Sequence, residues 1–251
     1  MVKEDNYDLK YRMIYFTSLL EKTADAVIPE DDKCECPICK SKFPIFLPVG
    51  VRVRANAQCP VCGSLERHRA LWMFCEERQI FCTGGRLLHF APEPIFHRKF
   101  SSMKNIDYWP VDINENMPGI RKAVDITDIP FEDNSIDMIV CNHVLEHIMD
   151  EKKALSELHR VLKPEGFAFL NVPILREKTL EKPEYNTPEL RFKYYGQHDH
   201  VRAYGKDYPV RLRSSGFNVE DIEFGRGFER NVLRKYGLVE DEKIYLCKKR
   251  E

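Results

Sequence analysis

From Gly85 to the end of the chain, short apolar segments alternate with segments that have the periodicity of a helix. Residues 94–103, 152–162 and 205–215 have the helical pattern. The apolar segments have the length of strands and cover residues 86–91, 106–113, 122–126, 136–141, 166–172, 217–224 and 243–248. Such alternation is typical of a mostly parallel sheet whose strands are joined by helices packed on its faces. We therefore expect an α/β fold with a seven-stranded, mostly parallel sheet and helices on both faces.

The size of the chain limits how many domains it can form. With 251 residues, 43% of them hydrophobic, it can bury one full α/β core and a small additional module. Its longest apolar runs, residues 138–141 and 167–170, are far shorter than the roughly 20 residues of a membrane-spanning helix. The charged and polar start of the chain has no signal-peptide or lipid-anchor pattern. We expect a cytoplasmic protein with no membrane span.

Four of the nine cysteines form two Cys-Pro-x-Cys pairs, Cys36 with Cys39 and Cys59 with Cys62, and nineteen residues separate the pairs. Each pair can turn two thiolates toward one point, so the two pairs supply the tetrahedral set of sulfur ligands that suits Zn²⁺. This spacing predicts a zinc ribbon with a structural metal, because thiolates fill all four positions. Cysteines kept as small buried apolar residues are the alternative. Cys34 breaks the paired geometry and is not assigned to the site.

Residues 34–80 are expected to form this zinc ribbon and a connecting helix. Apolar residues mixed with proline and glycine predict a short hairpin over residues 43–53, and Ser64 can cap a helix that runs to about Gln79. The first turns of that helix carry the basic side chains Arg67, His68 and Arg69. We expect these side chains to form salt bridges that tie the ribbon to the main domain. Contact with an anionic group of a substrate or cofactor is the alternative.

The N-terminal segment, residues 1–33, has its own helical pattern. Its apolar and aromatic side chains recur at three- and four-residue spacing, at Tyr7, Tyr11, Ile14, Tyr15 and Leu19. This spacing predicts an amphipathic helix that ends before Pro29 and packs against protein. A membrane-surface helix is the alternative, but the polar face lacks the dense band of Lys and Arg that anionic lipid requires.

Two stretches in the central part of the chain carry a family resemblance. They are DITDIPFEDNSIDMIVCNHVLEHIMD over residues 125–150 and ALSELHRVLKPEG over residues 154–166. Together they resemble the class I methyltransferases, in particular the subgroup of small-molecule type, and the resemblance extends from about residue 86 to residue 224. It implies a Rossmann-like domain over residues 81–251 and S-adenosylmethionine as the cofactor.

The resemblance assigns cofactor contacts to residues at successive strand ends. Asp112 matches the acid that accepts hydrogen bonds from the ribose hydroxyls, and Ile113 beside it belongs to the same site. A turn or helix cap is the alternative role of Asp112. Asp125 and Ile126 match the pair that borders adenine, where the carboxylate faces the exocyclic amine and the apolar side chain covers the ring. Asn142 and His143 match the positions beside the methionine part and the reactive methyl group; they are expected to bind there.

The loop after the first predicted strand departs from the family pattern. Most members have a glycine-rich turn there, whereas this chain has Ala91, Pro92, Glu93 and Pro94. Ala91 matches the first glycine, and Glu93 is expected to accept a hydrogen bond from the ammonium group of the cofactor. Loss of cofactor binding, caused by two prolines that stiffen the turn, is the alternative.

Methyl transfer from a sulfonium needs positioning and a base that removes the proton of the acceptor. His143 is one candidate base. The others lie in a segment over about residues 174–204, which is expected to form a lid over the cofactor. Its candidate residues are His198 and His200 as the base, Asp199 as the group that orients it, and Arg202 and Tyr204 as contacts to the substrate. The alternative is that these side chains only tie the lid to the body.

His143, Glu146 and His147 also match the inverted zinc-protease pattern. Such a site needs a metal-binding helix and a further acidic ligand. We disfavour it, because the residues span a strand end and the start of a helix.

The leading functional hypothesis is methyl transfer to an oxygen or nitrogen atom of a small molecule or glycan. One alternative is an RNA methyltransferase that docks RNA through its zinc ribbon, since residues 33–80 carry eight Lys or Arg against four acids. The net charge of −1 and the lack of an aromatic-Pro-Pro-aromatic motif after the fourth strand disfavour it. A second alternative is a non-catalytic adaptor. No feature indicates an oligomeric state.

Overall fold

The computed structural model describes residues 33–50 and 53–250, so the helix predicted before Pro29 lies outside the described residues. The chain divides into two compact units. The first, which we call the cysteine module, contains the described residues up to Gln79 and the segment Glu223–Glu242. The second, the sheet unit, contains Ile80–Ile222 and the described residues from Lys243 onward. Residues 223–242, which the sequence analysis included in the main domain, group with the cysteine module.

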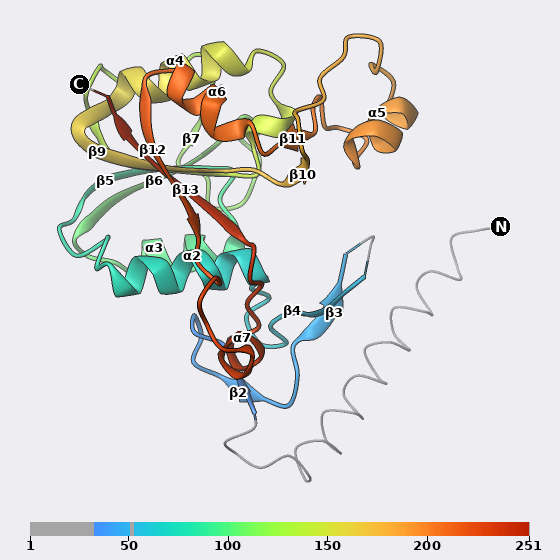
Figure 1. Cartoon of the computed structure of the whole chain (residues 1–251). Coiled ribbons are helices and arrows are strands. Elements are labelled where there is room, and N and C mark those ends of the chain that lie inside the picture. The colour runs from blue at the N-terminus through green and yellow to red at the C-terminus, as the bar shows by residue number, and fades with distance from the viewer. Residues whose placement is uncertain (1–32, 51–52, 251) are drawn as a thin grey trace. The chain divides into compact units, whose positions relative to one another are not determined.

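The sheet unit is built on seven strands in the order β12-β13-β9-β8-β5-β6-β7 (Figure 1). These strands are β5 (Gly85–Phe90), β6 (Ile106–Asp112), β7 (Lys122–Ala123), β8 (Ile136–Asn142), β9 (Leu162–Asn171), β12 (Phe217–Glu223) and β13 (Lys243–Lys249). From β9 through β8, β5 and β6 to β7 all neighbours are parallel, and β13 is antiparallel to β9. The predicted α/β fold with a seven-stranded, mostly parallel sheet is confirmed.

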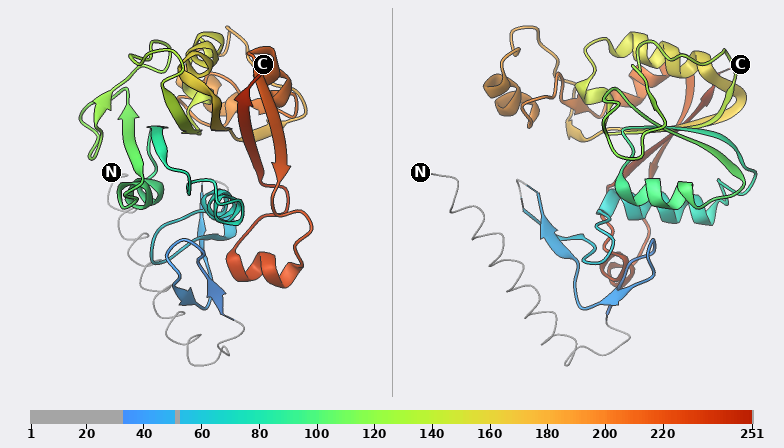
Figure 2. Two further views of the ribbon diagram at one scale, coloured as in Figure 1. Left: turned by 90° about the vertical axis from the view of Figure 1, so that its left-hand side faces the viewer. Right: turned by 180° about the vertical axis from the view of Figure 1, so that it is seen from behind.

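Helices cover both faces of this sheet, as the alternating pattern predicted (Figures 1 and 2). Helix α3 (Pro94–Ser101) lies on one face, and α4 (Glu151–Val161) and α6 (Tyr208–Ser214) lie on the other. The apolar residues of α4 recur three or four positions apart from Ala154 to its end, and they are buried in the core beneath it. Strand β8 is buried along almost its whole length because it has neighbours on both edges and helices on both faces.

Strand β5 pairs with β6 on one side and with β8 on the other. The chain therefore extends the sheet outward in two opposite directions from β5, first through β6 to β7 and then through β8 to β9. At such a reversal the connections leave toward opposite faces, and a crevice forms at the carboxyl ends of the two central strands. This constraint directs the search for a site to the residues that follow β5, β6 and β8.

Several element boundaries differ from those predicted. The third predicted strand, over residues 122–126, is only two residues long, because the chain turns at Asp125, whose backbone oxygen accepts a hydrogen bond from the Asp128 amide. The helix predicted from Gly205 begins at Tyr208, since Tyr204 and Gly205 form strand β11. Short side-chain and backbone hydrogen bonds of this kind are local alternatives to a regular element that apolar periodicity does not reveal.

The predicted lid segment runs from the end of β9 to α6. It contains β10 (Ile174–Arg176), α5 (Pro188–Tyr195) and β11 (Tyr204–Gly205), and β10 pairs in parallel with β11. We call residues 174–204 the excursion. In Figures 1 and 2 its helix α5 extends away from the end of the sheet near β10.

The cysteine module contains two small antiparallel pairs. Strand β1 (Cys34–Glu35) pairs with β2 (Lys42–Phe43), and β3 (Leu47–Val49) pairs with β4 (Arg54–Gln58). The second pair is the expected hairpin, with strands shifted relative to the predicted range. Two helices, α2 (Glu66–Glu77) and α7 (Arg230–Tyr236), complete the module.

The start of α2 differs from the prediction. Its N-cap is Leu65, and the hydroxyl group of Ser64 lies 3.3 Å from the Cys36 and Cys62 sulfurs and does not cap the helix. His68 accepts a hydrogen bond from the Leu65 amide through Nδ1 at 3.1 Å. His68 thus satisfies a free amide at the first turn of its own helix.

Arg69 does not form the predicted salt bridge. Its side chain is 0% exposed and donates to four backbone oxygens, those of Ala57, Ser64, Tyr236 and Gly237, at 2.6 to 3.0 Å. All four acceptors belong to the cysteine module. Arg69 therefore connects the cysteine-containing segment to the end of α7, and the basic helix face ties the module together internally.

No helix among the described residues is long and apolar enough to cross a membrane.

Arg160 and Glu157 on α4 hold the turn that precedes β8. The guanidinium of Arg160 donates to both carboxylate oxygens of Glu157 at 2.7 and 2.8 Å and to the backbone oxygens of Ile129 and Phe131. The Ile129 amide donates to Glu157 as well. Hydrogen bonds from Arg160 lower the pKa of Glu157 to about 2.

We expect Glu157→Gln to destabilise the protein by about 2 kcal/mol near pH 7, because it removes a charge-assisted pair whose carboxylate is largely buried. A lowered pKa in the folded state stabilises the fold above the unfolded pKa of about 4.3, and this stabilisation is lost as the pH falls toward about 2. The difference from the wild type should therefore shrink over that range in urea unfolding followed by circular dichroism. The exposed Glu165→Gln serves as the control, and a pH-independent difference would contradict this account.

Candidate functional site

A chain of polar groups runs along one edge of the sheet, from the carboxyl ends of β5, β8 and β9 to the amino-terminal half of the antiparallel strand β13. Glu93, just after β5, contacts His89 Nε2 through Oε2 at 2.9 Å and accepts a hydrogen bond from Asn142 Nδ2 through Oε1 at 3.1 Å. Asn142, at the end of β8, accepts in turn from Asn171 Nδ2 at 2.8 Å. The Tyr245 amide of β13 donates to Asn171 at 2.8 Å. The two predicted cofactor residues Glu93 and Asn142 therefore lie in direct contact at the point where the strand order reverses.

Sequence analysis missed two members of this chain, His89 and Asn171. The signal for Asn171 was present, since it is a polar residue at the end of an apolar strand, as Asp112 and Asn142 are. His89 is 0% exposed within β5, and it reads in the sequence as one more residue of an apolar strand.

The turn after β5 has the tight geometry that the family builds with glycine. Ala91 has a φ of 43°, in the left-handed region, and its amide donates to the Val111 oxygen at 2.9 Å. A side chain in this region costs about 1–2 kcal/mol. Glu93 is the N-cap of α3 and Pro94 is its first residue, a position where no amide donor is needed. Pro94 thus starts the helix at the position where proline is favoured.

Asp112 and Asp125 lie at neighbouring strand ends. Asp112 pairs with Ala123 across β6 and β7, and Asp125 follows two residues later. Each uses its Oδ1 to accept a backbone hydrogen bond at 2.8 Å from the residue two positions on, Asn114 and Thr127 respectively. Both carboxylates are therefore oriented by their own turns. Turn residue was the alternative role of Asp112, and this geometry is compatible with a second role for its Oδ2.

The two isoleucines assigned to the cofactor differ in exposure. Ile113 is 74% exposed, whereas Ile126 is 3% exposed and belongs to the core of the sheet unit. Apolar surface for a flat ring is therefore available at Ile113.

His143 follows directly on β8 in a left-handed conformation, with a φ of 55°. Its amide donates to the Asn171 oxygen at 2.8 Å, and its Nδ1 lies 3.4 Å from Glu146 Oε1. The side chain is 28% exposed. His143 thus stands at the carboxyl end of β8, beside Asn142 and open to solvent.

The three other candidate catalytic residues do not act as one group. His200 is 3% exposed and its ring packs edge-on against His147, with ring centroids 4.7 Å apart. Asp199 contacts His147 Nδ1 at 3.2 Å and does not orient His200. His198 stacks on Phe192 and contacts the Pro188 oxygen, so it belongs to the α5 side of the excursion. Burial lowers the pKa of His200.

Arg202 and Tyr204 are placed where they cannot contact a substrate. Arg202 is 1% exposed and donates to the Leu145 and Ile148 oxygens at 2.6 Å, and it pairs with Glu181. Tyr204 is 0% exposed and donates to Glu151 at 2.6 Å. The structure thus corrects the prediction of substrate contacts. Both side chains tie the excursion to the body, because their polar groups are used in buried hydrogen bonds.

The inverted zinc-protease pattern is not realised. Residues Leu145–His147 form a single 3₁₀ turn, which we label η2 as a short helix, and not the α-helix that such a site requires. His143 lies before this turn in the left-handed conformation.

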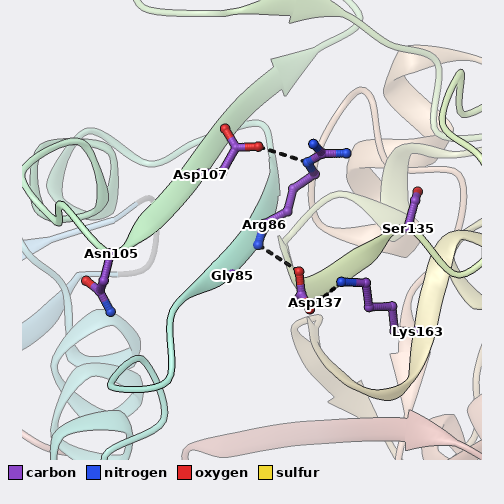
Figure 3. A pocket seen from close by; sticks show the side chains of 7 residues that line it. All are labelled: Gly85, Arg86, Asn105, Asp107, Ser135, Asp137 and Lys163. Atoms are coloured by element: carbon purple, nitrogen blue, oxygen red, sulfur yellow. Dashed lines mark hydrogen bonds and ion pairs between the residues drawn. The ribbon is translucent and has the colours of Figure 1, made fainter.

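A pocket of about 460 Å³ lies at the opposite edge of the sheet (Figure 3). Its lining residues are Gly85, Arg86, Asn105, Asp107, Ser135, Asp137 and Lys163. Its charges are paired, with Arg86 on Asp107 at 2.9 Å and Lys163 on Asp137 at 2.7 Å. Because these residues lie at the amino ends of β5, β6, β8 and β9, the pocket is away from the edge where parallel sheets of this kind bind ligands.

In the cysteine module, Cys36, Cys39, Cys59 and Cys62 place their sulfurs within 4.8 Å of one another. The Cys36–Cys62 and Cys39–Cys59 sulfur distances are 3.6 and 3.8 Å. A tetrahedral Zn²⁺ with sulfur ligands at about 2.3 Å places them about 3.8 Å apart. The residues therefore fit a zinc ion. Cys34 donates to the Arg234 oxygen and is not part of the group.

Comparison with known proteins agrees with this fold. A family model described as a methyltransferase domain matches residues 86–170. A demethylmenaquinone methyltransferase of Staphylococcus epidermidis is 45% identical over 148 residues, which cover 50% of this chain and 59% of that protein. A probable S-adenosylmethionine-dependent methyltransferase of Mycolicibacterium smegmatis is 30% identical over 97 residues, 38% of this chain and 34% of the relative.

Among solved structures, the YcgJ protein of Bacillus subtilis is similar, with a TM-score of 0.51 and 17% identity over 73% of this chain and 99% of the other. This likeness shows the fold. The chain spans 34% to 59% of the length of the two curated relatives above. Residues 86–170 of this chain therefore match a methyltransferase domain.

Proposed function

We propose that the protein transfers the methyl group of S-adenosylmethionine to an oxygen or nitrogen atom of a small molecule or glycan. The observation that carries this proposal is the contact between Glu93 and Asn142 at the strand-order reversal, with Asp112 at the neighbouring strand end. A relative's name, demethylmenaquinone methyltransferase, states a small-molecule substrate and supports that substrate class.

The residues present fit the proposed cofactor. Asp112 Oδ2 would accept hydrogen bonds from the ribose hydroxyls while Oδ1 remains on the Asn114 amide. Ile113 would give its exposed apolar surface to the adenine ring, and Asp125 would face the amine of the ring. Glu93 and Asn142 would hold the methionine end of the cofactor. There the carboxylate of Glu93 would accept a charge-assisted hydrogen bond from the ammonium group.

When bound, the cofactor supplies an electrophilic methyl group on a sulfonium. The protein then has to align an acceptor and remove a proton. Among the candidate bases, His143 best combines position at the end of β8 with exposure, and we propose it as the base. His200 is too buried to exchange a proton freely with solvent, and His198 is held on the α5 side of the excursion.

We expect Asp112→Ala to weaken S-adenosylmethionine binding about tenfold or more in calorimetry, because two hydrogen bonds to a charged acceptor are lost. Asp107→Asn is a matched control, since Asp107 lies on the same strand at its opposite end and pairs with Arg86 and Arg121. It should leave the affinity unchanged. If the wild-type protein shows no heat of binding with S-adenosylmethionine, the result would contradict the proposed enzyme activity and favour the adaptor alternative.

We further propose a structural zinc ion on the four paired cysteines. A module with so small an apolar core is stabilised mainly by its metal, whose binding can contribute about 10–16 kcal/mol to folding. The hydroxyl group of Ser64 lies 3.3 Å from the Cys36 and Cys62 sulfurs. It would donate a hydrogen bond to a thiolate of the metal site.

Replacing Cys36 and Cys59 by serine should remove the thiolate-to-cobalt charge-transfer absorption of the cobalt-substituted protein and unfold the cysteine module. Cys82→Ser is the control, because Cys82 is exposed and isolated from the four ligands. A charge-transfer band that persists in the double variant would show that other cysteines bind the metal.

A further inference from the structure

A second group of possible metal ligands lies in the sheet unit. Glu146 and His147 belong to the turn η2, and His200 comes from the excursion; we call these three residues the Glu146 cluster. One ligand atom of each lies within 4.8 Å of one ligand atom of both others. Glu146 also contacts His143 at 3.4 Å, so the cluster lies next to the carboxyl end of β8.

The side chain of Glu146 has a buried oxygen atom whose hydrogen-bonding capacity is not used by the described residues. The residue is 1% exposed, and among the described residues its Oε2 has no hydrogen-bond partner. Within the described part of the chain, its Oε1 contacts His143 Nδ1 at 3.4 Å, which is long for a hydrogen bond. A buried carboxylate with so little compensation is costly, and a bound cation removes that cost.

The two imidazoles are oriented as metal ligands usually are. His200 Nδ1 lies 3.3 Å from the Tyr195 oxygen, and His147 Nδ1 lies 3.2 Å from Asp199 Oδ2. A histidine that binds a metal through one nitrogen commonly donates its other N–H to a backbone oxygen or a carboxylate. Both rings therefore have Nε2 as the nitrogen available for a ligand.

A backbone hydrogen bond and the buried side chain of Arg202 fix how the excursion meets η2. The backbone amide of Val201, the residue after His200, donates to the backbone oxygen of Glu146 at 2.8 Å. Arg202 then donates to the oxygens of Leu145, Ile148 and Met149, which surround the turn. These bonds hold His200 across from Glu146 and His147, so the three donors are positioned before any ligand arrives.

We propose that Glu146, His147 and His200 bind a divalent transition-metal cation that is separate from the metal of the four cysteines. Two imidazole nitrogens and one carboxylate oxygen suit Zn²⁺, Co²⁺, Mn²⁺ or Fe²⁺ and leave coordination positions open. The 28% exposure of His143 and 34% exposure of His147 give solvent access to the cluster.

A cation at this position indicates which class of substrate the proposed methyl transfer uses. This inference rests on the proposed function. A hydroxyl group bound to the cation loses its proton more easily than in water. The acceptor oxygen gives this proton to His143 and gains the methyl group. The electron pair of the broken carbon–sulfur bond stays on the sulfur atom of the cofactor. The substrate class would then be a hydroxyl compound, and the product would be its methyl ether.

The test is a Co²⁺ titration of the full chain whose cysteine site has been loaded with Zn²⁺, followed by calorimetry and visible absorption. The wild type should bind one further Co²⁺ with weak d–d bands and no thiolate charge transfer. Glu146→Gln, which keeps the shape of the side chain, and His200→Ala should each weaken Co²⁺ binding about tenfold or more. His198→Ala is the matched control, because His198 lies in the same segment and outside the cluster.

If the buried variants fail to fold, His147→Ala replaces a side chain that is 34% exposed and should give the same loss. Wild-type protein that binds no further Co²⁺, or that binds it as well as folded Glu146→Gln does, would overturn the proposal. S-adenosylmethionine affinity is measured on the same samples and should be unchanged in His200→Ala. Failure of cofactor binding in the wild type would count against the proposed function, while the Co²⁺ result would stand independently.

Discussion

The pairing of β5 with β6 on one side and with β8 on the other is the constraint on which the rest of the sheet unit depends. It brings the residues after β5 and β8 to one edge, where Glu93 and Asn142 contact each other. The contact extends through Asn171 to β13, so an antiparallel strand added late in the chain also supports this edge. Polar groups at four strand ends are thereby held in one hydrogen-bonded chain, and a charged ligand that bound there would meet them already oriented.

Arg202 gives the excursion a fixed place beside that edge. A guanidinium that is 1% exposed is tolerated because carbonyl groups at η2 and Glu181 take up its donors. Breaking such an arrangement leaves a buried charge without partners, which is much more costly than the loss of a surface pair. The excursion is therefore anchored at its C-terminal end, whereas His198 and Asp199 stay exposed. Its anchored part is the one that brings His200 to Glu146.

The fold could be predicted from the sequence because periodicity reports burial directly, and burial decides which segments become strands and helices. Positions at strand ends, such as Asp112 and Asn142, followed from the same pattern together with the family resemblance. The roles of Arg202 and Tyr204 did not follow, because their residue types indicate charge and hydrogen-bonding capacity but not exposure. An arginine near a predicted active site and a buried arginine that holds a loop have the same appearance in a sequence. The short β7 and the position of Glu223–Glu242 depended on local turns and long-range contacts that no periodicity shows.

The two candidate metal centres also differ in how far a sequence pattern can predict them. The cysteines of each pair, which are separated by two residues, bring their thiolates together through one local turn, so their spacing alone predicts the four-sulfur site. The Glu146 cluster joins residues more than fifty positions apart in the sequence, and a backbone hydrogen bond from Val201 with the buried Arg202 brings them together. The local match to a zinc-protease pattern, which the sequence analysis disfavoured, combines His143 with His147, whereas in the fold the ring of His147 packs against that of His200. A metal centre of this kind becomes visible only when the tertiary contacts that orient its ligands are known.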